Sequence, residues 1–176
     1  ICNPQKWGRI SRERGFAQAA RALWQQQQFD IVQSHERIPG CDIYRAGDGV
    51  HRRWLQQRAR ILPAWRAQML MYDRYHRYVM RAEREMYQAP ELKAVICNAE
   101  MIKREIVEDF DIDANKIHVI YNSIDSSRFI PAQESQRAIL RQQFGLPADA
   151  VVFCFVGSGF ERKGLASAIR AIAGTS

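Results

Sequence analysis

Short apolar runs alternate along this chain with longer segments in which apolar residues recur every three or four positions. The short runs predict strands at FDIVQSH (29–35), CDIYRAGDG (41–49, a strand or an ordered loop), KAVICNA (93–99), NKIHVIYNS (115–123) and AVVFCFV (150–156). The periodic segments predict helices over 10–28, 51–88, 99–110, 136–146 and 165–173. Apolar strands that alternate with helices are typical of a parallel sheet covered on both faces, so the sequence predicts an α/β fold.

The longest helical segment, 51–88, carries one apolar stripe. Its members recur at intervals of three and four, which places them on one helix face: Trp65, Met69, Tyr72, Tyr75, Val79, Ala82 and Met86. Pro63 begins this helix or divides it from a shorter one, because proline lacks the N–H group that a helix interior needs. The stripe is buried in a core, or it forms part of an interfacial surface.

A polar, turn-rich stretch, DSSRFIPAQES (125–135), is the best candidate for a linker. About three strand–helix units precede it, and the first unit of a new series follows it. The sequence therefore predicts one domain over 1–124 and a second over 136–176. Because the chain begins without methionine and stops just after a helical pattern, we expect it to be a piece of a longer protein.

Positive charge is concentrated in one segment. The chain has a formal net charge of +7, and between Arg52 and Glu85 nine arginines face only three acidic residues. The polar face of the 51–88 helix carries Arg66, Arg74, Arg77, Arg81 and Arg84, interleaved with tyrosine and tryptophan. Such a surface suits an anionic membrane, at about 1 kcal/mol per basic residue near it, and equally a nucleic acid or an anionic glycolipid. A solvated face on a core helix is the remaining interpretation.

The four cysteines lie far apart and form no CxxC pair: Cys2, Cys41, Cys97 and Cys154. We expect reduced thiols in a cytosolic compartment, and neither a disulfide nor a metal site. No apolar run approaches the roughly 20 residues needed to cross a bilayer, and the N-terminus lacks a signal-peptide pattern.

The loop VGSGFERKG (156–164) follows a predicted strand and precedes a predicted helix. Gly157 and Gly159 would let the backbone approach a phosphate group closely, and Arg162 and Lys163 would supply positive charge. The loop matches neither GxxxxGK[ST] nor GxGxxG. A glycine-rich turn with solvated cations is the other interpretation.

The segment YRAGDGVH places Asp48 in a glycine-flanked loop directly after a predicted strand. A carboxylate there could act as a base or bind sugar hydroxyls. The alternative is a turn residue, because Asp-Gly is a common turn pair.

Several segments, in order, resemble one enzyme family. KAVICNAEMIKREIVEDFDIDANKIHVIYNSIDSSRFIP and RAILRQQFGLPADAVVFCFVGSGFERKG resemble the hinge region and the first donor-side loop of GT-B glycosyltransferases of the GT4 type. Together with PGCDIYRAGDG and DRYHRYVMRAEREMY they look like the bacterial lipopolysaccharide core α-glucosyltransferases, which add the first hexose to the inner-core heptose. Ser123 stands where glycine is usual in the hinge. The resemblance extends over most of the chain.

The resemblance implies a retaining transferase that moves a hexose, glucose, from a nucleotide-sugar such as UDP-glucose to a lipopolysaccharide inner-core acceptor. Arg162 and Lys163 would contact the donor diphosphate, with Gly157 and Ser158 lining the same pocket, and Asp48 would face the acceptor hydroxyl. Arg66, Arg74, Arg77 and Arg81 would form a membrane or acceptor surface. The family usually needs no metal or other cofactor, and no nucleic acid would be involved. We expect a peripheral protein on the cytoplasmic face of the bacterial inner membrane.

The same resemblance implies that residues 1–124 are the C-terminal part of the Rossmann-like acceptor domain. Residues 125–135 would be the interdomain linker, and 136–176 the first unit of the donor domain. We therefore expect this chain to be inactive by itself. Two alternatives stay open: another GT4 enzyme, of capsule or exopolysaccharide synthesis, and a non-catalytic module that binds anionic membrane or nucleic acid through its arginines.

Overall fold

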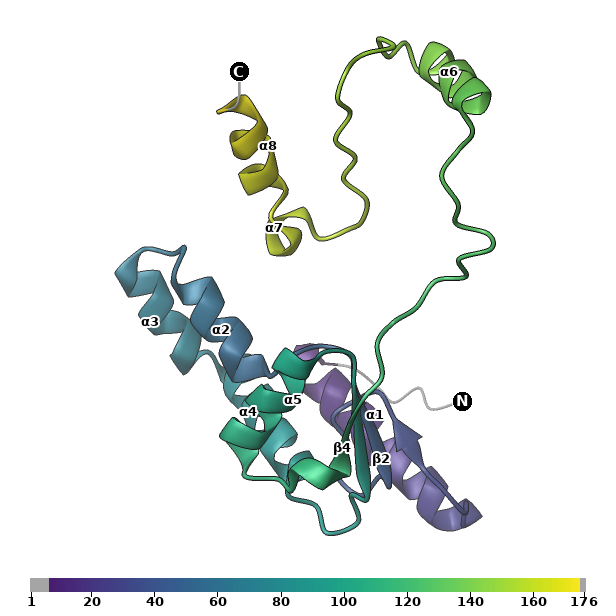
Figure 1. Ribbon diagram of the computed structural model, residues 1–176. Coiled ribbons are helices and arrows are strands. Elements are labelled where there is room, and N and C mark those ends of the chain that lie inside the picture. Colours follow the sequence, from purple (N-terminus) through teal and green to yellow (C-terminus); the bar gives the residue numbers. More distant parts are fainter. Residues whose placement is uncertain (1–6, 175–176) are drawn as a thin grey trace. The chain divides into compact units, whose positions relative to one another are not determined.

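The structure is a computed structural model that describes residues 7–174 (Figure 1). The chain divides into two compact units, Ile1–Ser123 and Ile124–Ser176, which we describe separately. Cys2 lies outside the described residues. Cys41 and Cys97 are buried free thiols, and Cys154 is an exposed free thiol.

The first unit is built on a four-stranded parallel sheet with the order β1-β2-β3-β4. Its strands are β1 (Gln33–Ser34), β2 (Ile43–Ala46), β3 (Ala94–Cys97) and β4 (Ile117–Val119). In the central pair Ile43 lies opposite Ala94, and Ala46 lies opposite Cys97. The predicted α/β fold with a parallel sheet is confirmed, although each strand is shorter than the apolar run that predicted it.

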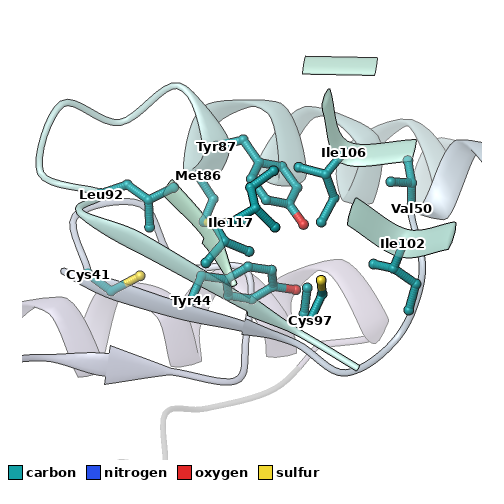
Figure 2. Close-up of a cluster of buried hydrophobic side chains, with 12 residues drawn as sticks. Cys41, Tyr44, Val50, Met86, Tyr87, Leu92, Cys97, Ile102, Ile106 and Ile117 are labelled. Carbon is teal, nitrogen blue, oxygen red and sulfur yellow. The ribbon is translucent and has the colours of Figure 1, made fainter. Parts of the chain in front are cut away.

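One face of this sheet carries the hydrophobic core. Tyr44, Cys97 and Ile117 point from β2, β3 and β4 into a cluster with side chains of the covering helices, among them Tyr87 and Ile106 (Figure 2). The opposite face is only half-buried, because burial alternates residue by residue along β2 and β3. The side chains of these two strands therefore follow the period of two, with the second face of the sheet less deeply buried than the first.

Helices of the first unit are α1 (Arg9–Gln27), α2 (His51–Ala59), α3 (Ala64–Tyr72), α4 (Arg74–Tyr87) and α5 (Glu100–Phe110), with a 3₁₀ turn at Ala114–Lys116. The segment 51–88 forms three helices: the division expected at Pro63 is confirmed, and a second division, at Asp73, was not predicted. Pro63 precedes α3. Asp73 caps α4 by accepting the N–H groups of Tyr75 and His76 at 2.8 and 3.0 Å.

The division of this segment also splits its apolar stripe. Val79 and Met86 on α4 are buried in the first unit. Trp65, Met69 and Tyr72 on α3 are 60, 63 and 71% exposed. Figure 1 shows α2 and α3 side by side, extending away from the sheet. The stripe is thus part core and part exposed surface.

The second unit contains α6 (Glu134–Gln143), α7 (Phe160–Lys163) and α8 (Leu165–Ala173). The strand predicted at 150–156 is absent, and Val151, Phe153 and Val156 are exposed. A parallel strand needs a neighbouring strand for its hydrogen bonds, and residues 124–174 contain no strand that could pair with this run. The run therefore has the composition of a buried strand without a partner to pair with.

No helix within residues 7–174 combines the length and the apolar character needed to cross a membrane.

Candidate functional site

The carboxyl edge of the parallel sheet gathers polar side chains from three successive loops. Asp48 follows β2, Asn98 follows β3 and Asn122 follows β4. Asn98 Nδ2 donates to the carbonyl oxygen of Gly47 at 3.3 Å, and Arg45 Nη2 donates to Asn122 Oδ1 at 3.3 Å. The three loops are therefore tied together at the edge where α/β folds bind their ligands.

Asp48 is exposed in this group, in a loop that is held on both sides. The N–H of Gly47 donates to the carbonyl oxygen of Arg45 at 3.0 Å, and Val50 is buried. The Asp48 carboxylate makes no hydrogen bond or ion pair within residues 7–174. A fixed, solvated carboxylate in this position can accept hydrogen bonds from sugar hydroxyls.

Asn98 carries an unused hydrogen-bonding group beside this loop. Its Oδ1 is buried and accepts no hydrogen bond within the described part of the chain. A buried amide oxygen is nearly always satisfied in folded proteins. A hydroxyl donor at this edge would satisfy it. No role for Asn98 was inferred from the sequence, where its signal is a polar residue directly after a buried strand.

A buried carboxylate lies beneath the first turn of α2. Glu83 on α4 is 2% exposed and accepts the N–H of His51 at 3.1 Å through Oε2. Its Oε1 accepts Arg37 Nε at 3.1 Å. Burial raises the pKa of Glu83, and the charge of Arg37 opposes that rise. The sequence offered one signal: Glu83 lies four residues after Val79 and three before Met86, on the buried side of the helix.

Two histidines meet next to this carboxylate. His51 Nε2 and His76 Nδ1 are 3.1 Å apart, and the ring of Trp54 lies 5.4 Å from that of His51. Burial, together with the charges of Arg37 and His76, lowers the pKa of His51 to about 4. Burial also lowers the pKa of His76. Both rings are therefore neutral at pH 7, where one donates and the other accepts a single hydrogen bond.

In the second unit, the loop 156–164 brings Gly157 and Lys163 together. The backbone of Gly157 has φ 141°, and the Lys163 ammonium occupies the place where a Cβ at position 157 would project. The N–H of Lys163 donates to the carbonyl oxygen of Gly159 at 3.0 Å, and Gly159 has φ 73°. Ser158 lies between these glycines. Only glycine permits this backbone and this close approach.

Arg162 lies beside Lys163 in the last turn of α7, and both are accessible to an anion near this loop. The charge pattern seen in the sequence is thus retained in the structure. Asp48 belongs to the first unit and this loop to the second. The assignments of Asp48 and of Gly157, Ser158, Arg162 and Lys163 to a catalytic cleft remain predictions.

The arginines expected on one helix face are divided between two helices. Arg66 is on α3, where its guanidinium lies 4.9 Å from the ring centre of Trp65. Arg74, Arg77 and Arg81 are exposed on α4, and Arg81 Nε donates to Glu85 Oε1 at 2.7 Å. The single arginine-rich helix of the sequence prediction is therefore wrong, because Asp73 ends one helix and begins the next.

Across residues 7–174, no three or more histidine, cysteine, aspartate or glutamate side chains are grouped so that they could hold a metal ion.

Comparison with known proteins gives a family and a fold. The family model described as Glycosyltransferase Family 4 matches residues 3–128. Among solved structures, "Crystal Structure of WaaG, a glycosyltransferase involved in lipopolysaccharide biosynthesis" superimposes with a TM-score of 0.76 at 20% sequence identity, over 98% of this chain. This chain spans 45% of the length of that structure. No curated protein matches the sequence.

Proposed function

This chain belongs to Glycosyltransferase Family 4, and we propose that the full-length protein transfers glucose from a nucleotide-sugar, UDP-glucose, to a lipopolysaccharide inner-core acceptor with retention of configuration. The proposed reaction uses the nucleotide-sugar as a substrate and needs no metal or other resident cofactor. The protein would act as a peripheral enzyme on the cytoplasmic face of the bacterial inner membrane.

One observation carries the proposal. The fold of this chain is the Rossmann-like α/β fold of GT-B glycosyltransferases, and it aligns over 98% of its length with a glycosyltransferase of lipopolysaccharide biosynthesis. The order of the segments supports the same assignment, because the 156–164 loop follows the hinge-like segment that ends at Pro131. The choice of glucose, of UDP and of the inner-core acceptor belongs to the proposal.

Donor activation is assigned to the loop 156–164. Bond cleavage in a nucleotide-sugar leaves a nucleoside diphosphate that gains negative charge in the transition state. Arg162 and Lys163 would stabilise that charge, and Gly157 and Ser158 would let the diphosphate approach the backbone. The Lys163 ammonium lies against Gly157 in the structure, so the cation is already at the loop.

Acceptor binding is assigned to the carboxyl edge of the sheet. Asp48 would accept a hydrogen bond from the acceptor hydroxyl, and the unsatisfied Oδ1 of Asn98 would take a second hydroxyl of the same sugar. Because Asp48 is exposed, its carboxylate can be reached by the acceptor and could orient the nucleophile or take its proton.

Membrane attachment is assigned to α3 and the start of α4. Trp65, Met69 and Tyr72 present apolar and aromatic surface, and Arg66 lies next to Trp65. Exposed aromatic residues beside arginines are typical of helices that lie in the interface of an anionic bilayer. Arg74, Arg77 and Arg81 would add attraction to acidic headgroups.

The Trp65→Ser variant of this chain should bind vesicles that contain phosphatidylglycerol about tenfold more weakly than the wild type. Losing the burial of a large apolar side chain removes about 1.5–3 kcal/mol, and 1.4 kcal/mol corresponds to a factor of ten. Flotation of the chain with these vesicles measures the effect. Trp7→Ser, which removes an even more exposed tryptophan outside α3, is the matched control and should leave binding unchanged.

Two results would contradict the membrane assignment. The first is equal flotation of wild type and Trp65→Ser. The second is salt-sensitive binding of the wild type to duplex DNA without any flotation, which would favour the nucleic-acid module instead.

The proposed reaction is tested by incubating the full-length protein with UDP-glucose and a lipopolysaccharide acceptor that ends at the inner core. Mass spectrometry should show the acceptor with one added hexose, and UDP should appear in equal amount. Transfer to a capsule or exopolysaccharide acceptor, with none to the inner core, would contradict the acceptor assignment and leave the family unchanged.

A further inference from the structure

A groove lined by four arginines lies between α1 and α4. Arg14 and Arg21 reach it from α1, Arg37 from the loop after β1, and Arg81 from α4. The groove has a volume of about 380 Å³. Glu85 is the only acidic residue in its lining. None of the residues assigned above to donor activation or acceptor binding takes part in it.

Arg37 is held in place from beneath the groove. Its Nε donates to the buried Glu83 at 3.1 Å, and its side chain is 23% exposed. A guanidinium group has five N–H donors, and this is the one hydrogen bond that Arg37 makes within residues 7–174. Arg37 therefore offers a fixed cation whose other donors remain available to a ligand.

Arg21 is placed by the shape of the facing loop. Gly40 has φ 94°, and a Cβ built there would lie 3.3 Å from Arg21 Nε. Glycine at this position lets the guanidinium rest on the loop, and within the described residues Arg21 forms no ion pair or hydrogen bond. Arg14 lies 5.6 Å from the ring centre of Tyr78, on the same groove.

Positive charge exceeds negative charge at this place. Glu83 forms a salt bridge with Arg37 from below the groove. Glu85 forms an exposed salt bridge with Arg81, in which the Arg81 side chain is 80% and the Glu85 side chain 49% accessible. An exposed pair of this kind stabilises a protein by about 0–1 kcal/mol. Arg14 and Arg21 have no carboxylate partner of this kind. Four cations around one depression repel one another, and an anion in the groove would relieve that repulsion.

The size and lining of the groove indicate what kind of molecule would carry the anionic group. Pockets for small molecules usually measure about 300–1,000 Å³, so the groove has room for more than one phosphate ion. Ala17, Pro39 and Tyr78 add apolar surface to the same lining, next to the arginines. An aromatic ring beside cations suits a ligand with a C–H-rich face and a charged end.

We propose that this groove binds a phosphorylated saccharide. The guanidinium groups of Arg21 and Arg37 hold the phosphate through charge-assisted hydrogen bonds, and the sugar ring lies against Tyr78 and Pro39. The proposal is independent of the transfer reaction, and it gives Arg81 a role at the groove in addition to its predicted place on a membrane surface.

Calorimetric titration of this chain with glucose 6-phosphate tests the proposal. The wild type should bind glucose 6-phosphate, and Arg21→Gln should weaken binding at least about tenfold, because charge-assisted hydrogen bonds are lost. Gly40→Ala should weaken it as well, since the added Cβ crowds Arg21. Arg12→Gln is the matched control: it removes one charge from an exposed position of α1 outside the groove. It should stay within about twofold of the wild type.

Three parallel measurements separate other sources of binding. Inorganic phosphate should bind more weakly than glucose 6-phosphate, and glucose should not bind. Equal affinity for phosphate and glucose 6-phosphate would overturn the saccharide assignment. Equal losses in Arg21→Gln and Arg12→Gln would show a general charge effect and overturn the site. Binding to phosphatidylglycerol vesicles alone, unchanged in Arg21→Gln, would overturn it too. Unfolding midpoints equal to that of the wild type confirm that the variants fold.

Discussion

Replacing Lys163 with glutamine in the full-length protein should lower kcat for sugar transfer about 100- to 1,000-fold, the loss seen when one donor to a developing anion is removed. Lys163 is assigned to the departing diphosphate, whose charge grows in the transition state. Such a change should lower kcat and kcat/KM by similar factors, because the interaction strengthens during the reaction. Steady-state kinetics with UDP-glucose measure both.

The neighbouring positions sharpen this prediction. Arg162→Gln should have a comparable effect. Gly157→Ala should lower activity as well, because φ 141° is strained for alanine and the added Cβ would displace the Lys163 ammonium. Arg137→Gln removes an exposed charge from α6 in the same unit and serves as the control, with turnover close to that of the wild type. Near-normal turnover of Lys163→Gln and Arg162→Gln would make the loop a glycine-rich turn with solvated cations.

The largest expected change in stability comes from breaking the Arg37–Glu83 pair from its exposed end. Arg37→Met should lower the free energy of unfolding by about 3 kcal/mol at pH 7, because it leaves a buried carboxylate without its cation. Glu83→Gln should cost less, about 1 kcal/mol. Glutamine still offers an oxygen to the N–H of His51, and the partly exposed Arg37 can turn to water. Urea unfolding measures both changes.

The pH dependence of this difference follows from the raised pKa of Glu83. A carboxyl group whose pKa is raised by folding favours the fold while it is protonated. That contribution is present below the usual carboxyl pKa of about 4.3 and is lost as pH rises through the folded pKa. Arg37→Met raises the folded pKa further, so its deficit should be smaller at pH 5 than at pH 7. Removing the charge of Arg37 also lets the lowered pKa of His51 rise. That change reduces the deficit at pH 5 as well, so it acts in the same direction.

A deficit in Arg37→Met that is equal at the two pH values would contradict this account of the buried pair. A larger loss in the free energy of unfolding for Glu83→Gln than for Arg37→Met would contradict it as well. Glu83 is the more deeply buried partner, so leaving its charge without a counter-charge should destabilise the protein more than leaving Arg37 unpaired.

The sequence predicted the sheet better than it predicted the helices around it. Val95, Cys97 and Ile117 lie in short apolar runs that form strands because the sheet buries them. These strands could therefore be predicted from composition. The break at Asp73 was missed because the apolar stripe continues on both sides of it. The hydrogen bonds by which the Asp73 carboxylate caps the N–H groups of Tyr75 and His76 exist only once α4 has begun. The strand predicted at 150–156 is absent for another reason. Composition shows that a run of residues can form a strand, but it does not show whether a neighbouring strand is present to pair with it.

The candidate sites divide in the same way. Asp48 and the 156–164 loop were found from glycine spacing and family resemblance, which are local properties. Asn98 Oδ1 and the Arg21–Arg37 groove depend on segments that meet only in three dimensions. Glu83 lies between these cases, since its spacing from Val79 and Met86 is a local signal of a charge on the buried face, although no role for it was inferred from the sequence.

The anomeric configuration of the product tests the central claim most directly. Proton NMR of a reaction containing the full-length protein, UDP-glucose and the inner-core acceptor should show a new α-glucosidic linkage, with the donor's α configuration retained, and UDP released in equal amount. A β-linked product, or no transfer from any nucleotide-sugar to any saccharide acceptor, would contradict the assignment of this protein as a retaining nucleotide-sugar-dependent glycosyltransferase.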